Sequence, residues 1–417
     1  MKTCFFTLFF LIITTILHAQ ITQPTQPSSG YGGKTYPHGG VTIRAYDNNT
    51  TTGGFYLYTP ATPQPVSAPV VIFNHGYSAY NPAVYGKWIE HLVKRGNIVI
   101  FPRYQIEVAT LASQFTPNTV KSIKRAFDTL AANPTFTQPI QGQVAILGHS
   151  YGGVVSANLA HNWSSYGIPK PKALLMACAG GIDLGKLSSY AQMDASVHIL
   201  AIAEFEDNLV DSTFSIDIFT KTPLVPTMRK NYIMHYTDAT GSPAINATHS
   251  EPCAPDLTYT NNATNAIIAP SLLSRIDATD YYLYWKLSDA LLDCAFNNRG
   301  CSTAFGNTAE QRSMGKWSNS TSVKELRVLP TSTTAISDIN FKSTVFPNPV
   351  NNQLHLNTEG GIRSVEIMDM TGRIVLKQVF QNRAKQQTID LQSQNSGIYC
   401  LKMDTDMGIA VHKIIKK

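Results

Sequence analysis

The chain has little charge and few cysteines for its length. Only 14% of its 417 residues are Asp, Glu, Lys or Arg, and the formal net charge is +6. No cluster of Lys and Arg with interleaved aromatic residues is present, so we do not expect nucleic-acid binding. Beyond the first twenty residues, no stretch is long and apolar enough to cross a bilayer. With 43% hydrophobic residues, the composition suits a globular protein with a sizeable core, and the length favours two domains.

The first residues predict a secretory signal peptide. Lys2 precedes an apolar run, 5–17, and Ala19 supplies the small residue at the expected cleavage point. We therefore expect residues 1–19 to be removed during export. Residues 20–40, rich in Gln, Thr, Pro and Gly, are expected to form an extended lead-in.

Export makes the remaining cysteines potential disulfide partners. Cys294 and Cys301 enclose a small polar loop after a predicted helix, and they are the pair that we expect. An odd number of cysteines follows the cleavage point, so at least one stays a thiol. Cys178, at the apolar run 173–177, is expected to be a buried strand residue, while pairing of Cys253 with either helix-side cysteine stays open.

Short apolar runs alternate with helical patterns between residues 41 and 330. This alternation predicts βαβ units, and therefore an α/β domain whose mostly parallel sheet has helices on both faces. The expected strands are 41–47, 54–59, 70–73, 97–101, 143–147, 173–177, 197–203 and 231–236; the expected helices are 84–95, 118–131, the segment after residue 150, and 279–295.

Gly148-His149-Ser150-Tyr151-Gly152 lies between an expected strand and an expected helix. A G-x-S-x-G sequence in this context predicts a nucleophile elbow, a turn so tight that only very small residues fit two positions from the serine. Ser150 is therefore the candidate nucleophile. The alternative is a glycine-rich helix start in which the serine is an ordinary N-cap.

A serine hydroxyl needs a base that takes its proton, and the base needs an acid that orients it. The loop after strand 197–203 is where the acid is expected. There we prefer Asp207, because Asp-x-x-Val, which turns back into an apolar contact, resembles the acid loop of α/β-hydrolases. Glu204 is the second choice and Glu206 the third.

The base is expected after the last long strand. His249 lies there, in a loop of small residues. His235 lies within the preceding strand and His75 beside the loop after strand 70–73, so we expect structural roles for both. The chain order serine, acid, histidine is the one that this strand pattern requires.

Two backbone N–H groups are expected to stabilise a negatively charged oxygen during the reaction. One belongs to Tyr151, directly after the serine, and the other to Tyr77, in the loop after strand 70–73. Gly76 and His149 are expected to line the substrate pocket. All of these residues follow strands, at the sheet edge where active groups of α/β folds gather. The chemistry needs no metal and no organic cofactor.

These motifs, together with Thr248-His249-Ser250-Glu251-Pro252, resemble those of secreted α/β-hydrolases over about residues 40–330. The closest groups are cutinase-like and polyester hydrolases, dienelactone hydrolases and chlorophyllase-like esterases. The resemblance implies hydrolysis of small or polymeric carboxylic esters through an acyl-serine intermediate. Polyester hydrolases usually carry an aromatic residue after the strand that follows the elbow, whereas this chain has Ala177-Cys178-Ala179-Gly180-Gly181 there.

Two other interpretations remain open for this region. One is a non-catalytic binding module on a degenerate hydrolase scaffold, which the complete set of serine, acid and histidine disfavours. The other is a lipase or peptidase of the same fold. The chain has no long, lid-like apolar insertion, which disfavours a lipase. We expect a monomer.

The C-terminal segment predicts a small β-sandwich over residues 341–417, after a Ser/Thr-rich linker, 331–340. Phe346-Pro347-Asn348-Pro349, the turn at 369–373 and the basic C-terminus resemble the sorting domain of type IX secretion substrates. The resemblance implies a contact with that secretion machinery and export across an outer membrane, to the medium or the cell surface. A carbohydrate-binding module is the alternative, but no aromatic-lined face is evident.

Overall fold

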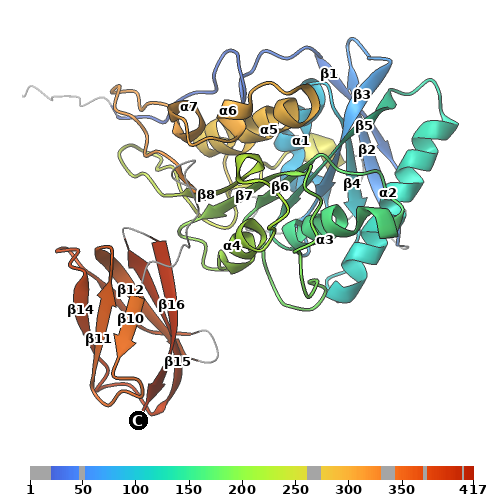
Figure 1. The fold of residues 1–417 in the computed structure, drawn as a ribbon. Helices are drawn as coiled ribbons and strands as arrows, with labels where there is room; N and C mark the ends of the chain where they lie inside the picture. Colours follow the sequence, from blue (N-terminus) through green and yellow to red (C-terminus); the bar gives the residue numbers. More distant parts are fainter. Residues whose placement is uncertain (1–19, 47–51, 261–273, 330–342, 370–372, 406–407) are drawn as a thin grey trace, which may run out of the picture. The chain divides into compact units, whose positions relative to one another are not determined.

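The computed structural model describes residues 20–46, 52–260, 274–329, 343–369, 373–405 and 408–417 (Figure 1). The chain divides into two compact units, residues 1–333 and 334–417. The predicted signal peptide and the predicted linker lie outside the described residues. None of the described helices combines the length and the apolar character that a membrane span requires.

A nine-stranded sheet in the order β1-β2-β4-β3-β5-β6-β7-β8-β9 forms the centre of the first unit. Neighbouring strands run parallel from β4 to β8, whereas β1, β2 and β9 pair in antiparallel fashion. The strands are β1 Gly40–Ala45, β2 Gly54–Ala61, β3 Ser67–Asn74, β4 Ile98–Arg103, β5 Gln138–His149, β6 Ala173–Ala177, β7 His198–Glu204, β8 Lys230–His235 and β9 Arg327–Leu329.

Helices cover both faces of this sheet, as predicted (Figure 1). Side chains of β3 alternate between two cores: Val71 and Phe73 pack with α1 and α5, whereas Val70 and Ile72 pack with α2, α3 and α4. A strand that is buried on both faces is a continuous run of apolar residues, and for this reason the central strands could be predicted from the sequence. The helices are α1 Gly86–Lys94, α2 Phe115–Ala132, α3 Tyr151–Tyr166, α4 Thr213–Thr220 and α5 Trp285–Asn297.

Several short elements were not predicted, because one or two turns carry no readable periodicity. They include α4 and β9, and the expected helix 279–295 begins as a π-helix before it continues as α5. The expected loop 59–69 is shorter, because β2 reaches Ala61 and β3 begins at Ser67. The other short helices are η1 Pro82–Tyr85, η2 Ala112–Gln114, η3 Thr227–Arg229, η4 Leu257–Thr260, η6 Asp280–Tyr284, α6 Cys301–Ala304 and α7 Ala309–Arg312.

The lead-in, residues 20–40, is tied to α5 by hydrogen bonds. The Tyr31 hydroxyl donates to Asp293 at 2.8 Å, and the backbone N–H of Gly32 donates to Asp289 at 2.8 Å. These bonds bring the start of the described chain onto the helical layer that also contains α1.

The second unit consists of two antiparallel sheets, β10-β11-β14 and β13-β12-β15-β16, around its own apolar core. This arrangement fits the predicted small β-sandwich. Its strands β14 and β16 were not predicted. The bounds are β10 Ser343–Phe346, β11 Gln353–Thr358, β12 Ile362–Asp369, β13 Ile374–Val379, β14 Gln386–Asp390, β15 Gly397–Thr405 and β16 Gly408–Lys416.

The disulfide between Cys294 and Cys301 is confirmed and joins the end of α5 to the start of α6. Cys178, Cys253 and Cys400 are thiols, so Cys253 does not pair with a helix-side cysteine. Cys178 is buried, as expected, although it lies one residue beyond β6.

Removing this disulfide with the double substitution Cys294→Ala/Cys301→Ala should lower the free energy of unfolding by about 2 kcal/mol, because the unfolded chain regains the entropy of an open short loop. Urea denaturation of both proteins measures the difference. Reductant should destabilise the wild type by a similar amount and leave the double variant unaffected. Equal stability of the two oxidised proteins would contradict the prediction.

Candidate active site

Ser150 lies on a strained turn between β5 and α3. Its backbone angles are φ 55° and ψ −126°, a region that residues other than glycine rarely adopt. A Cβ atom on Gly148 would lie 2.2 Å from the carbonyl oxygen of Gly152, and one on Gly152 would lie 2.3 Å from that of Asn74. Both glycines are therefore required by space, and the turn has the tight geometry expected of a nucleophile elbow.

The structure brings Ser150, His249 and Asp207 into one hydrogen-bonded line. His249 Nε2 is 3.0 Å from Ser150 Oγ, and His249 Nδ1 is 2.6 Å from Asp207 Oδ2. The other oxygen of Asp207 accepts the backbone N–H groups of Leu209 and Val210, each at 2.9 Å. Because the ionised carboxylate only accepts, Nδ1 carries the proton and the Nε2 lone pair faces the serine hydroxyl. This arrangement can take a proton from Ser150.

The competing acid and base of the sequence analysis form a separate pair. Glu204 Oε2 lies 2.6 Å from His235 Nδ1, and the Tyr284 hydroxyl donates to the other Glu204 oxygen. Burial by itself lowers the pKa of His235, but the carboxylate of Glu204 outweighs it and the pKa is raised. Glu206 accepts the backbone N–H of Thr237. Neither glutamate is the partner of His249.

His75 has a structural environment, as expected. Its ring stacks on that of Tyr104 with 3.8 Å between centroids, and its Nδ1–H donates to the carbonyl of Gly76 at 2.7 Å. Burial lowers its pKa to about 3, so the ring is neutral. This histidine supports the loop that contains Gly76 and Tyr77.

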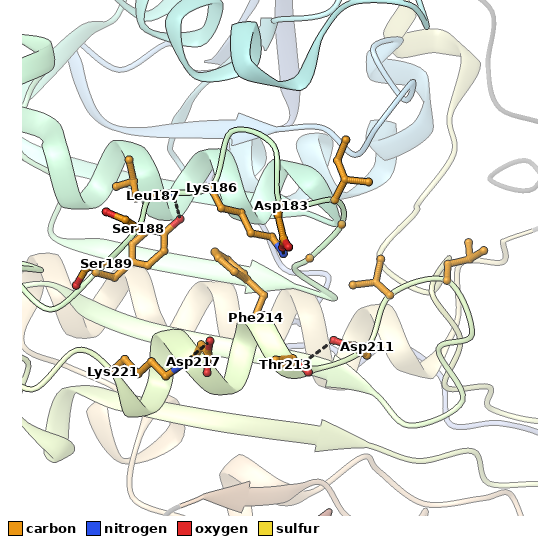
Figure 2. Close-up of a pocket in the computed structure, with 16 residues that line it drawn as sticks. Asp183, Lys186, Leu187, Ser188, Ser189, Asp211, Thr213, Phe214, Asp217 and Lys221 are labelled. Carbon is orange, nitrogen blue, oxygen red and sulfur yellow. Dashed lines mark hydrogen bonds and ion pairs between the residues drawn. The ribbon is translucent and has the colours of Figure 1, made fainter. Parts of the chain in front are cut away.

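A pocket of about 440 Å³ opens over Ser150, and Gly76, Tyr77, His149, Tyr151 and His249 line it. Tyr151 is the first residue of α3, so its N–H has no acceptor within the helix. Among the described residues, we find no protein acceptor for the N–H of Tyr77 either. Both groups can therefore serve a negatively charged oxygen at Ser150. A second hollow, of about 610 Å³, adjoins this pocket (Figure 2).

Tyr85 is a residue of this site that the sequence analysis missed. Its hydroxyl accepts the N–H of Gly76 at 2.8 Å and lies 2.9 Å from His149 Nδ1. His149 Nε2 is 2.9 Å from the carbonyl oxygen of His249, which can only accept, so Nε2 carries the hydrogen and Nδ1 accepts from Tyr85. Burial, with the nearby His249, holds the pKa of His149 well below its usual value, which keeps the ring neutral.

These bonds join the loop after β3, the elbow and the loop that contains His249. Tyr85 lies in η1, one turn before the apolar face of α1, and its sequence context is that of an ordinary core aromatic. We therefore see no sequence signal that would have identified it.

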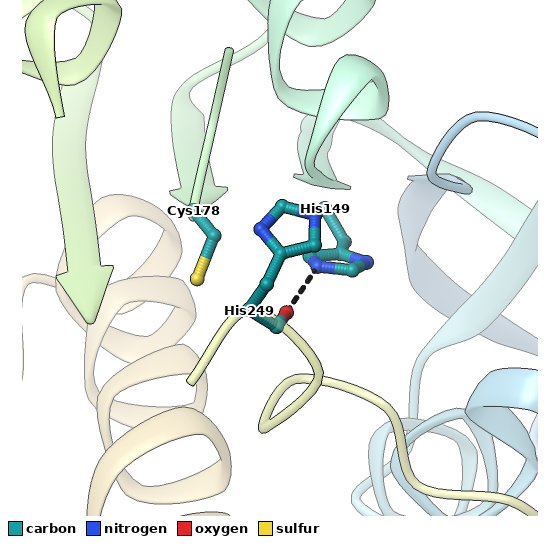
Figure 3. A group of neighbouring side chains, drawn as sticks. All are labelled: His149, Cys178 and His249. Carbon is teal, nitrogen blue, oxygen red and sulfur yellow. Dashed lines mark hydrogen bonds between the residues drawn. The ribbon is translucent and has the colours of Figure 1, made fainter. Parts of the chain in front are cut away.

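His149, Cys178 and His249 gather beside Ser150, with one ligand-type atom of each lying within 4.8 Å of the others (Figure 3). Such a set resembles a metal site in composition. Tyr85 and the His249 carbonyl, however, engage both nitrogens of His149, and burial raises the pKa of the Cys178 thiol well above its usual value. Hydrogen bonding accounts for the cluster, and we assign no metal to it.

Two family models match the chain. Residues 45–183 match the model described as Chlorophyllase. Residues 344–417 match the model described as Secretion system C-terminal sorting domain. No curated protein matches the chain.

The chain joins a chlorophyllase-like α/β-hydrolase domain to a type IX secretion sorting domain. The sorting domain indicates export across the outer membrane, to a secreted or cell-surface state, and implies an interaction with the secretion machinery. The chlorophyllase match makes the first domain an ester hydrolase in general. It covers the loop after β3 and the elbow and ends before Asp207 and His249.

Glu251, two residues after His249, is a half-buried carboxyl group of the chlorophyllase-like domain. Glu251 accepts the Thr248 hydroxyl at 2.7 Å. Burial raises the pKa of Glu251 to about 7, and the carboxylates of Glu204 and Asp277 add to the effect. The folded domain therefore retains a proton that the unfolded chain releases at lower pH.

The substitution Glu251→Gln should flatten the dependence of stability on pH. The pKa of Glu251 rises from 4.5 to about 7 on folding, so its contribution is present below pH 4.5 and is lost as the pH rises toward 7. The loss amounts to about 3 kcal/mol at most. Thermal unfolding between these pH values measures it, with the exposed Glu107→Gln as a control that should retain the wild-type profile. Parallel profiles for wild type and Glu251→Gln would exclude this role.

The substitution Tyr85→Phe should lower kcat for ester hydrolysis by about tenfold or more with little change in KM, because Gly76 and His149 lose their common partner and the loops lose alignment. Tyr58→Phe is the matched control, since its buried hydroxyl donates instead to the carbonyl of Tyr259. Steady-state kinetics measures kcat and KM of both variants. Unfolding curves of both variants show whether a loss of kcat comes from misaligned loops or from lower stability of the whole domain. Equal kcat values for the two variants would refute the alignment role.

Proposed function

We propose that the chlorophyllase-like domain is a serine carboxylic-ester hydrolase with Ser150 as nucleophile, His249 as general base and Asp207 as the acid that orients it. The observation that carries this proposal is the hydrogen-bonded line from Asp207 through His249 to Ser150, at the base of the 440 Å³ pocket. The strained turn at Ser150 supports the same role, because it presents the hydroxyl above the sheet.

In this mechanism His249 Nε2 takes the serine proton while Ser150 Oγ attacks the ester carbonyl carbon. The carbonyl oxygen becomes negatively charged and accepts the N–H groups of Tyr77 and Tyr151. The protonated His249 gives its proton to the departing alcohol oxygen, which leaves an acyl-serine. Water, activated by the same imidazole, then adds to the acyl carbon and releases the carboxylic acid.

The walls of the pocket favour an apolar group next to the ester. Ile182, Leu209 and Val210 line it together with the ring of Tyr77, which is 44% exposed at the rim. We propose small or polymeric esters as substrates, as for cutinase-like enzymes. The segment 178–182 after β6 supplies no aromatic side chain to the pocket, so an aromatic wall for a polymer ring has to come from the tyrosines that line it, of which Tyr77 lies at the rim.

Substitution of Ser150→Ala or His249→Ala should lower kcat for p-nitrophenyl acetate by at least about 10⁴-fold, because each removes a group that acts in every turnover. Asp207→Asn should cost about 10³ to 10⁴-fold, since the imidazole loses the partner that sets its tautomer. Glu206→Gln is the matched control in the same loop and should retain activity. Circular dichroism checks the fold of each variant.

Labelling with a serine-directed phosphonate gives an independent reading of the same proposal. The wild type should be modified at Ser150 and Ser150→Ala should not. Undiminished turnover in Ser150→Ala or His249→Ala would reject the assignment. Loss of activity in Glu206→Gln with full activity in Asp207→Asn would move the acid to residue 206.

A further inference from the structure

The second hollow continues directly from the catalytic pocket. The two share a wall made by two segments, Gly180–Ile182 after β6 and Leu209–Val210 after β7. The rest of the hollow is formed by the loop 183–190 and by the first turns of α4, which carry Thr213, Phe214 and Asp217 (Figure 2). Its volume, about 610 Å³, lies in the range of ordinary ligand sites. A molecule held at Ser150 can therefore extend over the shared wall into the hollow.

The hollow differs chemically from the catalytic pocket. Its lining is rich in hydroxyl and charged groups, whereas the pocket is lined mainly by apolar side chains. Ser188, Ser189 and Thr213 are exposed to the hollow and offer both donors and acceptors. One ester can thus place an apolar part in the pocket and a polar part in the hollow.

Both lysines of the hollow are paired with carboxylates. Lys186 Nζ lies 2.9 Å from Asp183, and Lys221 Nζ lies 2.8 Å from Asp217. Asp211 accepts the backbone N–H of Thr213 at the start of α4. With each lysine paired and Asp211 in addition, no surplus positive charge is present to select a carboxylate or a phosphate. The lining has three carboxylates against two lysines, so it disfavours an anion and is compatible with a neutral partner.

An aromatic ring lies among these polar groups. Phe214 is held edge-to-face against Tyr190 at 5.6 Å, and the ammonium of Lys186 lies 5.5 Å from its centroid. Phe214 is only 7% exposed, so it offers the hollow a small apolar contact and not an open stacking face. A small apolar contact beside hydroxyl and carboxylate groups matches a ligand that has an apolar C–H face and a rim of hydroxyls. Sugars have this combination, and an aliphatic chain lacks the hydroxyls.

We propose that the hollow binds the alcohol part of the ester and that this alcohol is a neutral, polyhydroxylated ring of the sugar type. The inference rests on the proposed esterase function and specifies its substrate class. We place the alcohol on this side because the alcohol oxygen takes its proton from His249. His249 is hydrogen-bonded to Asp207, and Asp207 accepts the backbone N–H groups of Leu209 and Val210, which belong to the shared wall. Hydrolysis breaks the acyl C–O bond; water supplies the hydroxyl of the acid and the hydrogen of the released sugar hydroxyl.

Binding can be tested apart from catalysis in the full-length Ser150→Ala protein. Calorimetric titration with an acetylated methyl glucoside should show tighter binding than titration with hexyl acetate. Adding Thr213→Trp, which fills the hollow, should weaken glucoside binding by about tenfold or more. Thr220→Trp is the matched control, because Thr220 is an exposed residue of α4 outside the hollow, and it should leave the affinity unchanged.

Kinetics with otherwise wild-type protein completes the test. The ratio of kcat/KM for the acetylated glucoside to that for p-nitrophenyl acetate should fall at least tenfold in Thr213→Trp, mainly through KM, and stay constant in Thr220→Trp. Preference for hexyl acetate, or an unchanged ratio in Thr213→Trp, would overturn the inference while leaving the esterase intact. Failure of the wild type to hydrolyse any ester would instead reject the proposed function, and the titrations would still decide whether the hollow binds the sugar.

Discussion

The site depends on the close approach of the elbow to the end of β3. Gly152 lies against the carbonyl groups of Asn74 and His75, and Gly148 against the start of α3, with no space for a Cβ at either position. This contact forces Ser150 into its positive φ, a conformation that costs free energy and persists only where the surroundings hold it. The same contact places the loop after β3 beside the serine, so that Tyr77 and Tyr151 face one pocket.

A second layer of hydrogen bonds keeps the loops around the serine in register. The Tyr85 hydroxyl joins Gly76 to His149, and His149 joins the elbow to the backbone of His249. These groups are neutral, and Tyr85, Gly76 and His149 are buried, so water does not compete strongly for their hydrogen bonds. Alignment of the proposed base therefore depends on main-chain positions as well as on Asp207.

The loops that follow the carboxyl ends of the parallel strands β6 and β7 form the walls beyond the serine. These loops separate an apolar pocket from a polar hollow. The sheet thus fixes where the proposed catalytic residues lie, and the side chains of the loops determine which substrate is preferred. For an exported hydrolase, as the sorting domain indicates, the substrate is met outside the outer membrane.

Local sequence was sufficient for the fold class, the elbow and the disulfide. Buried parallel strands are continuous apolar runs, and Gly148 and Gly152 flank Ser150 at fixed spacing, so these features depend only on near neighbours along the chain. The short elements α4 and β9 were missed because they are stabilised by packing and carry no period of their own.

The sequence alone determined that a serine, an acid and a histidine follow strands of the sheet in the expected order, and that a secretion domain follows them. Only the tertiary structure decided which carboxylate meets which histidine: Glu204 pairs with His235, and Asp207 pairs with His249, 42 positions along the chain. It also revealed Tyr85. The physical reason is that such pairings depend on distances between loops that are remote in sequence, and residue spacing along the chain does not encode those distances.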